Sequence, residues 1–435
     1  MNQQKQQNGN GKIVAIIMMI LLFGMISFVT NLAAPMGIVL KNQFGVTNFE
    51  GMLGNAMNFI AYFVMGIPGG LLLQRMGYKK TALIAIAVGF IGIFIQFLSG
   101  HTGESSAFGV YLLGAFVAGL SMTLLNTVVN PMLNTLGGGG NKGNQLIQVG
   151  GSFNSVMAAF TPAFVGILIG NAAKAKITDI FPVMYIAMGV FALVFFVLWA
   201  VSIPEPHAER ASEPLGKLLS GAMKFRHLIL GAIGIFVYVG VEVGTPGIMN
   251  LWLSDANAST VGATTAGSVV FTYWILMLVG RLFGAFTGNK ISSKTMLTVT
   301  SIVGLILVAL AIFSPSSSQV SLPLLQRSDV GAISLGMAQI PINAMFLVLV
   351  GLCTSIMWGS IFNLAVEGLG KYLAAASGIF MTLVCGGGIL PLIQGKMADV
   401  AGYLPSYWVI FIGLAYLLFY ALIGSKNVNK DISVE

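Results

Sequence analysis

The sequence contains very little charge. Only 8% of its 435 residues are Asp, Glu, Lys or Arg, whereas 56% are apolar. A water-soluble domain carries roughly 25% charged residues, so this composition excludes a soluble globular protein. Charged side chains are costly inside a bilayer, and here they fall in short gaps between long apolar segments. The chain is therefore predicted to be an integral membrane protein.

Cysteine and histidine are also scarce, which argues against several chemistries. The two cysteines, Cys353 and Cys385, fall inside apolar segments without the spacing of metal ligands or of a disulfide framework, so we expect them to be buried, small apolar side chains. The three histidines show no His-Glu-x-x-His pattern, and no Gly-Lys-Ser/Thr nucleotide loop occurs. We therefore predict no metal site, no ATP-driven pump and no enzyme.

Apolar segments of about 20 residues can cross a bilayer as helices. The segments found here lack the period of two that the spans of a β-barrel show, so an all-α membrane protein is predicted. Twelve segments are long enough, at approximately 13–40, 51–73, 81–99, 107–133, 145–169, 182–201, 227–253, 267–286, 296–313, 341–364, 374–397 and 405–423.

The basic residues indicate the orientation of these spans. Alternate gaps hold sixteen Lys and Arg residues on one side and five on the other. Cytoplasmic loops carry the excess of Lys and Arg, so both termini are predicted to be cytoplasmic and the location to be the cytoplasmic (inner) membrane of a bacterium. The net charge of +8 then reflects topology, and no nucleic-acid partner is expected.

The order of the segments suggests an internal duplication. We predict a six-helix N-terminal bundle at 1–201, a cytoplasmic linker at 202–226 and a six-helix C-terminal bundle at 227–435, related by pseudo-symmetry. A second polar stretch, 314–334, is also interpreted as a linker. Equivalent gaps of the two halves carry glycines followed by basic residues, starting at Gly70 and at Gly280.

The first of these gaps reads Gly70-Leu-Leu-Leu-Gln-Arg75-Met-Gly77-Tyr-Lys79-Lys80 and resembles the cytoplasmic loop signature of the major facilitator superfamily, with Gln74 in place of the usual Asp. Further stretches are similar to the fucose/hexose (glucose/galactose) permease branch of that superfamily. They are Asn31-Leu, Tyr238-Val-Gly-Val-Glu242-Val, Val279-Gly-Arg281, Ser355-Ile-Met357, Glu367-Gly-Leu-Gly and Gly386-Gly-Gly-Ile-Leu-Pro391-Leu-Ile-Gln394-Gly.

This resemblance implies the major facilitator fold, with a solute site between two bundles and transport by alternating access. It also implies a small neutral sugar, a hexose or 6-deoxyhexose, as substrate. Proton-coupled members of the branch carry acidic residues where this sequence has Ala34 and Asn126. Neither of these side chains can bind a proton, so coupling here must use another group or be absent.

The polar residues within the spans supply the candidate site. Asn126, Asn130 and Asn134 are spaced four apart, so they share one face of a helix. Sugars offer hydroxyls and an apolar ring face, which amides, a carboxylate and an aromatic plate can bind. Trp358 is the expected plate, with Trp274, Phe153 and Tyr238 as alternatives. Polar side chains that merely hold helices together are the alternative interpretation. The predicted substrate-binding residues are Asn31, Asn58, Asn126, Asn130, Asn154, Tyr238, Glu242 and Trp358.

Glu242 is a carboxylate deep within a span, ~22 Å from the predicted start of its helix. Arg281 lies about 9 Å from the cytoplasmic end of the next helix, so we predict different depths and a poor ion pair. Glu242 is predicted to accept substrate hydrogen bonds or to replace the missing proton carrier. The predicted gate and cytoplasmic-loop residues are Gly70, Arg75, Gly77, Lys79 and Arg281.

The leading functional prediction is a cation-coupled importer of a small neutral sugar, with H⁺ or Na⁺ as the coupling ion and no other cofactor. An uncoupled sugar facilitator and an exporter of small amphipathic compounds are the alternatives on the same scaffold. A channel or a receptor fits the topology alone. The predicted partners are the sugar and membrane lipid, and the protein is expected to work as a monomer.

Overall fold

The computed structural model describes residues 11–31, 48–169, 177–203, 205, 215–255, 257–261, 263–327, 333–429, 432 and 434. Within these ranges, ten helices are long and apolar enough to cross a membrane. One of them, Ala56–Ser99, contains two of the predicted spans, because α2 (Asn48–Ser99) is interrupted at Gly77, which has a φ of 79°. The predicted span 145–169 lies in α4 (Gly140–Ile169), which is not among the ten. The predominantly helical membrane architecture is confirmed, and the count of twelve stays a prediction.

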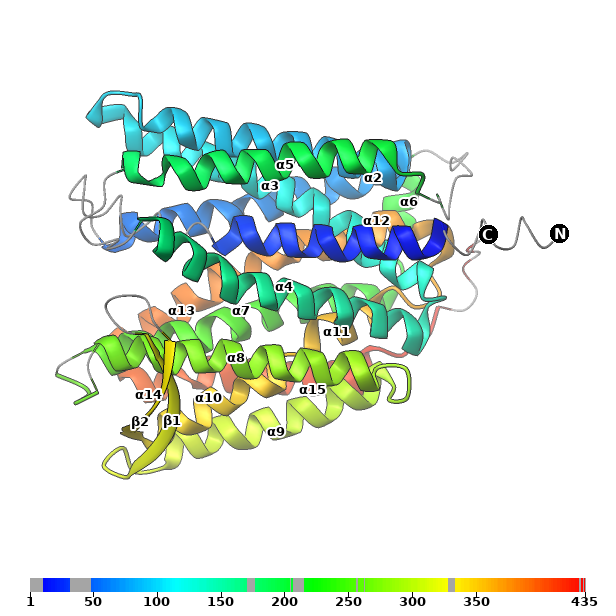
Figure 1. The fold of residues 1–435 in the computed structure, drawn as a ribbon. Helices are drawn as coiled ribbons and strands as arrows, with labels where there is room; N and C mark the ends of the chain where they lie inside the picture. Colours follow the sequence, from blue (N-terminus) through cyan, green and yellow to red (C-terminus); the bar gives the residue numbers. More distant parts are fainter. Residues whose placement is uncertain are drawn as a thin grey trace.

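The N-terminal half, residues 11–201, is made of long helices. The first helix, Gly11–Asn31, is followed by α2, α3 (Glu104–Leu136), α4, a short 3₁₀ turn (Ile177–Ile180) and α5 (Phe181–Ala200). α2 packs on α3 and α5 (Figure 1). Small residues permit this approach, since a Cβ added to Gly92 would meet the backbone nitrogen of Ala118 at 2.5 Å.

The C-terminal half, residues 226–434, contains more interruptions. After the short α6 (Leu215–Ala222), its elements are α7 (Arg226–Ser254), α8 (Ala263–Thr287), α9 (Ser293–Phe313), β1 (Gln319–Arg327), β2 (Ile333–Pro341), α10 (Ile342–Thr354), α11 (Met357–Ala365), η2 (Gly370–Tyr372), α12 (Leu373–Thr382), η3 (Leu383–Cys385), α13 (Gly386–Ala401), α14 (Tyr403–Ser406), α15 (Trp408–Phe419) and η4 (Tyr420–Gly424). Two predicted spans are therefore broken, 341–364 between α10 and α11 and 374–397 at η3. Cys353 and Cys385 are buried and unpaired, as predicted.

The interpretation of 314–334 as a linker is wrong. β1 and β2 form an antiparallel hairpin in which Gln319 pairs with Pro341 and Arg327 with Ile333. Along β1, Leu324 is fully buried whereas Ser321 and Pro323 are exposed. This alternation is the period of two that predicts a strand with one face packed, and it is visible in the sequence.

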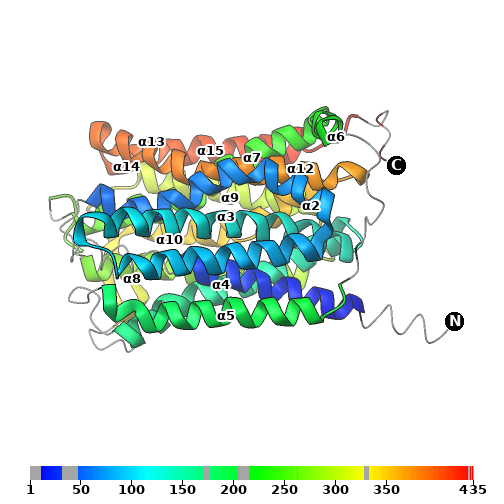
Figure 2. The ribbon, with the colours of Figure 1, turned by 90° about the horizontal axis from the view of Figure 1, so that it is seen from above.

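Among the described residues, two of the contacts between the halves are the most extensive. In one, α2 lies against α12 and η3, and in the other α4 lies against α8 and α11 (Figures 1 and 2). The first helix begins at the same end of the molecule as α3 ends, α4 and α9 begin and the chain terminates (Figure 1). We call this the termini end. At α9 the chain is capped by Ser292, whose hydroxyl accepts a hydrogen bond from the Thr295 N–H at 3.1 Å.

Candidate functional site

The three asparagines of α3 form one buried stripe, as their spacing predicts. Asn130 donates through Nδ2 to the backbone oxygen of Asn126 at 2.9 Å and to Asn126 Oδ1 at 3.3 Å. Asn126 in turn donates to the hydroxyl of Tyr62 on α2 at 2.6 Å. Asn134 is buried one turn further along the same face. The stripe therefore runs from the interior of the N-terminal half towards the termini end.

The stripe joins the two halves through its amides. Trp358 Nε1 donates to Asn130 Oδ1 at 3.0 Å, and Asn134 Nδ2 donates to Asn363 Oδ1 at 2.6 Å. Asn363 in turn donates through Nδ2 to Ser293 Oγ of α9 at 2.9 Å. Neither Asn363 nor Ser293 was predicted as a site residue. An isolated amide between Phe362 and Leu364 is the sequence signal that points to Asn363.

Trp358, the expected aromatic plate, lies at the centre of a ring cluster. Its ring centroid is 6.3 Å from that of Tyr238 on α7 and 6.1 Å from that of Phe380 on α12, both in edge-on geometry. Tyr238 is fully buried. Aromatic pairs prefer this edge-to-face arrangement, so the cluster holds the indole in one orientation.

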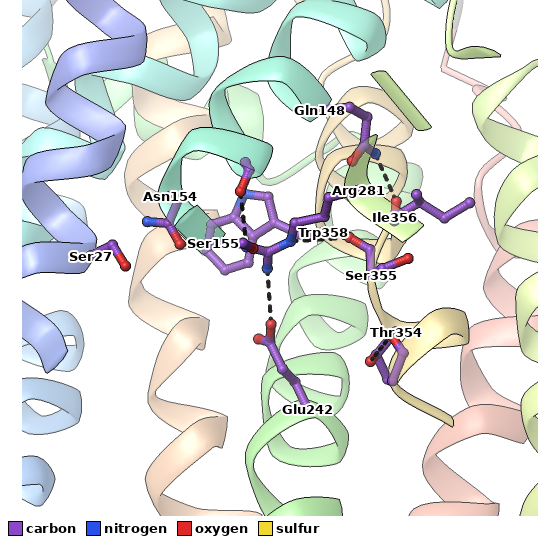
Figure 3. A network of polar contacts seen from close by, with 12 residues as sticks. Ser27, Gln148, Asn154, Ser155, Glu242, Arg281, Thr354, Ser355, Ile356 and Trp358 are labelled. Atoms are coloured by element: carbon purple, nitrogen blue, oxygen red, sulfur yellow. Dashed lines mark hydrogen bonds and ion pairs between the residues drawn. The ribbon is translucent and has the colours of Figure 1, made fainter. Parts of the chain in front are cut away.

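Glu242 and Arg281 form an ion pair, so the prediction that they are poor partners is wrong. Arg281 Nη2 lies 3.1 Å from Glu242 Oε1 (Figure 3). The two side chains are only 12% and 13% exposed. The prediction compared positions along two helices as if both helices ended in one plane. The Arg281 side chain is long and α7 and α8 need not end in one plane, so the two charged groups can meet. Arg281 thus lies in the central network, and its role as a gate residue stays a prediction.

The remaining contacts of Arg281 come from both halves. Its Nη1 donates to Gly151 O, Asn154 Oδ1 and Ser155 Oγ of α4 at 3.2, 3.4 and 2.7 Å, and its Nε donates to Ser355 O at 3.3 Å. Asn154 therefore lies in the network, and its own Nδ2 donates to Phe23 O of the first helix at 3.0 Å.

The break between α10 and α11 supplies two of the acceptors in this network. Ser355 O accepts from Arg281, and Ile356 O accepts from Gln148 Nε2 of α4 at 2.9 Å (Figure 3). Irregular backbone at membrane depth is tolerated where protein groups satisfy it. Interrupted helices of this kind are typical of solute sites in transporters.

Two predicted ligands are not joined to the network by the hydrogen bonds of the described residues. Asn31 donates to Ser27 O at 2.8 Å within its own helix. Asn58 is buried against α3, where a Cβ on Gly119 would lie 3.3 Å from Asn58 Oδ1.

The glycines of the predicted loop lie at the termini end. A Cβ on Gly70 would meet the Ala374 backbone oxygen at 2.6 Å, so this glycine permits the close contact of α2 with α12. Gly77 has positive φ, and a Cβ there would lie 2.7 Å from Glu205 Oε2.

The charged residues of that loop have different surroundings. Glu205 accepts from the backbone N–H groups of Tyr78 and Lys79 at 2.7 and 2.9 Å, and Lys79 Nζ donates to Trp199 O and Val201 O at 2.9 and 2.6 Å. Arg75 is exposed. Glu205 was not predicted, although a carboxylate between Pro204 and Pro206 directly after a span is a visible signal.

The described ranges contain no group of three or more His, Cys, Asp or Glu side chains that could hold a metal ion. The network can instead offer amide donors and acceptors, an indole N–H and one charge pair. Such a set can bind neutral hydroxyl groups, and it can also fasten helices to one another.

Comparison with known proteins gives consistent matches over nearly the whole chain. The model of the Major Facilitator Superfamily matches residues 16–391. A glucose/galactose transporter of Brucella abortus is 31% identical over 424 residues, covering 95% of this chain and 94% of that protein. A putative glucose/galactose transporter of Helicobacter pylori strain J99 is 29% identical, covering 94% and 96%. The L-fucose-proton symporter of Escherichia coli is 20% identical, covering 84% and 82%.

Solved structures show the same fold. A major facilitator transporter, FucP, in the outward conformation matches with a TM-score of 0.78 at 17% identity, covering 96% of this chain and 100% of that chain. The proton:xylose symporter XylE bound to 6-bromo-6-deoxy-D-glucose matches with a TM-score of 0.70 at 13% identity, covering 96% and 98%.

Proposed function

The chain belongs to the major facilitator superfamily, and from this premise we propose that it is a secondary transporter that imports a small neutral sugar by alternating access. The relatives that carry a curated name are glucose/galactose transporters and an L-fucose-proton symporter. A hexose or a 6-deoxyhexose is therefore the proposed substrate. The chain is a transporter and not an enzyme.

The proposed architecture is twelve membrane spans in two six-helix bundles, 1–201 and 227–435, joined by the linker 202–226. The ten candidate helices support it, because one of them contains two spans, and α4 provides the remaining one. The excess of Lys and Arg in alternate gaps supports cytoplasmic termini in the inner membrane of a bacterium, with the termini end facing the cytoplasm. We further propose a lipid-embedded monomer that needs no second copy to form the site.

The observation that carries the sugar proposal is the network at the contact of the two halves. It combines uncharged amides and an indole with one ion pair that is neutral as a unit. Amides match sugar hydroxyls, and an indole face matches the apolar face of a sugar ring. A cavity for amphipathic compounds would be broader and more apolar. The proposed substrate ligands are Asn31, Asn58, Asn126, Asn130, Asn154, Tyr238, Glu242 and Trp358.

Glu242 is the proposed coupling group, with H⁺ or Na⁺ as the ion. Asn126 stands where proton-coupled members of the branch carry an acid, and its amide is engaged with Tyr62. Glu242 lies at the network and contacts α8 through Arg281, so a change in its charge acts directly on the contact between the halves.

An uncoupled facilitator is the second candidate, and one observation favours it. Arg281 already neutralises Glu242 at 3.1 Å, so the site carries no free charge that requires a coupling ion. The two candidates differ in whether an ion gradient drives accumulation of sugar against its own gradient.

The test uses purified protein in liposomes with labelled D-glucose, D-galactose and L-fucose, under a pH gradient and a Na⁺ gradient imposed separately. The proposal expects saturable uptake of at least one sugar and accumulation under one of the gradients. Glu242→Gln is expected to abolish accumulation but to retain exchange of internal for external sugar. Uptake without accumulation under either gradient supports the facilitator, and absence of saturable uptake contradicts both.

A further inference from the structure

The Arg281 guanidinium divides its nitrogen atoms between the two halves. Among the described residues, Nη1 donates to the N-terminal half, at Gly151 O, Asn154 Oδ1 and Ser155 Oγ of α4. Nε and Nη2 donate to the C-terminal half, at Ser355 O and Glu242 Oε1. One nearly buried side chain of α8 therefore bridges both halves in the conformation described here (Figure 3).

The two halves also contact each other between Arg281 and the termini end. Further towards that end, Gln145 Nε2 of α4 donates to Ala285 O of α8 at 3.0 Å, and a Cβ on Gly288 would lie 3.0 Å from the Gln145 Cα. Asn134 and Asn363 close the same end between α3 and α11. The halves are thus in contact on the side of the network where the chain termini lie.

Separation of α4 from α8 would break the three bonds of Nη1 and leave the other two partners in place. Glu242 and Ser355 move with Arg281 because they belong to the same half. The cation is then still paired with a carboxylate after separation, which avoids an isolated charge at membrane depth. Lysine, a point donor, could not reproduce this division.

We propose that Arg281 is a positioning residue that latches α4 to α8 and so sets the balance between the closed and the open termini end. This inference rests on the proposed alternating-access function and deepens it. While it is ionised, Glu242 acts as the counter-charge of the latch, whereas Ser155, the acceptor at 2.7 Å, is its shortest attachment on α4.

Ser155→Ala tests the latch without touching the ion pair. The matched control is Ser152→Ala on the same helix, because the Ser152 hydroxyl donates to Gln148 O within α4 and, among the described residues, makes no hydrogen bond to the other half. Both serines are buried. Arg281→Lys is the second test variant, since it keeps the charge next to Glu242 but removes the forked donor.

The readout is the distance distribution between spin labels at Lys142→Cys and Lys290→Cys, measured by pulsed electron paramagnetic resonance in a Cys353→Ala/Cys385→Ala background. Both lysines are exposed at the termini end, one in each half. Loss of a hydrogen bond to a charged group changes an equilibrium by about tenfold, so Ser155→Ala should raise the ratio of long to short distances by that factor. Arg281→Lys should shift it in the same direction, and Ser152→Ala should not.

The latch is overturned if Ser155→Ala and Arg281→Lys both give the same distribution of spin-label distances as Ser152→Ala. Equal unfolding temperatures for Ser155→Ala and Ser152→Ala would show that a shift is conformational and not a loss of stability. The distance measurement needs no sugar, so it tests the latch even if the protein transports none of the tested sugars. Normal sugar transport with an unchanged distribution contradicts the latch alone.

Discussion

The indole nitrogen of Trp358 donates a hydrogen bond to Asn130 Oδ1 at 3.0 Å, and this bond connects the C-terminal half to the N-terminal half. Asn130 is fully buried, and its own Nδ2 is directed to Asn126. The bond therefore fixes the orientation of the indole at the contact between the halves. Both residues are proposed sugar ligands, so the same bond sets how the indole face meets a sugar ring.

Trp358→Phe should weaken sugar binding. Phenylalanine keeps an aromatic face but leaves the buried Asn130 oxygen without its donor, which costs about 1–3 kcal/mol, or roughly a 5- to 150-fold change in affinity. Initial uptake rates in proteoliposomes would show a raised KM. Trp199→Phe is the control because Trp199 is 66% exposed. An unchanged KM for Trp358→Phe would remove the indole from the site.

Replacing one residue of the Glu242–Arg281 ion pair should lower the stability of the protein more than replacing both residues. Glu242→Gln or Arg281→Gln leaves one nearly buried charge unpaired, which destabilises a protein by up to about 3–5 kcal/mol. The double variant has no unpaired charge, so its unfolding temperature in detergent should recover towards that of the wild type. Lys290→Gln, an exposed loop change of equal charge, should have little effect. A double variant less stable than both singles would contradict this account.

A covalent link between Asn134 and Asn363 should arrest transport. Their side-chain atoms approach to 2.6 Å across the halves, so cysteines at both positions in a background without Cys353 and Cys385 lie within reach of a short bifunctional methanethiosulfonate. Alternating access requires the termini end to open, so linked protein should lose sugar exchange and regain it on reduction. Asn134→Cys alone should not respond to the reagent. Full exchange by linked protein would show that this end does not open.

Gly77→Ala should destabilise the loop between the two parts of α2. Its φ of 79° costs a residue with a side chain roughly 1–2 kcal/mol, and the new Cβ would lie 2.7 Å from Glu205 Oε2. A lower unfolding temperature is expected. Gly103→Ala is the matched control, since φ is −61° there and no atom lies within 4 Å of a new Cβ. Equal unfolding temperatures for the two variants would show that the positive φ at Gly77 does not affect stability.

Local spacing predicted the helices and the shared face of the asparagine stripe, because both depend on residues three or four apart. Local spacing could not predict which residues the stripe contacts in the other half. Trp358 and Asn130 are 228 positions apart, and Asn134 and Asn363 are 229 apart, so these pairs form only when the halves pack together.

The incorrect predictions also concern features that depend on how distant parts of the chain pack together. Neither Pro nor Gly stands at the break itself, Ser355 and Ile356, and the carbonyl oxygens of these two residues accept hydrogen bonds from Arg281 and Gln148. Glu242 and Arg281 were predicted at different depths because position along a helix does not include the length of the side chain or the offset between neighbouring helices. The hairpin at β1, in contrast, was readable from its alternation of apolar and polar residues.

The central claim is that this chain carries a neutral sugar across the membrane by alternating access. Entrance counterflow tests it most directly: proteoliposomes loaded with unlabelled D-galactose or D-glucose are diluted into a trace of the same sugar carrying a label. The account predicts a transient internal excess of label above the equilibrium level, which protein-free liposomes do not show. A label that rises only to equilibrium, as through a channel, or that does not enter at all, would contradict it.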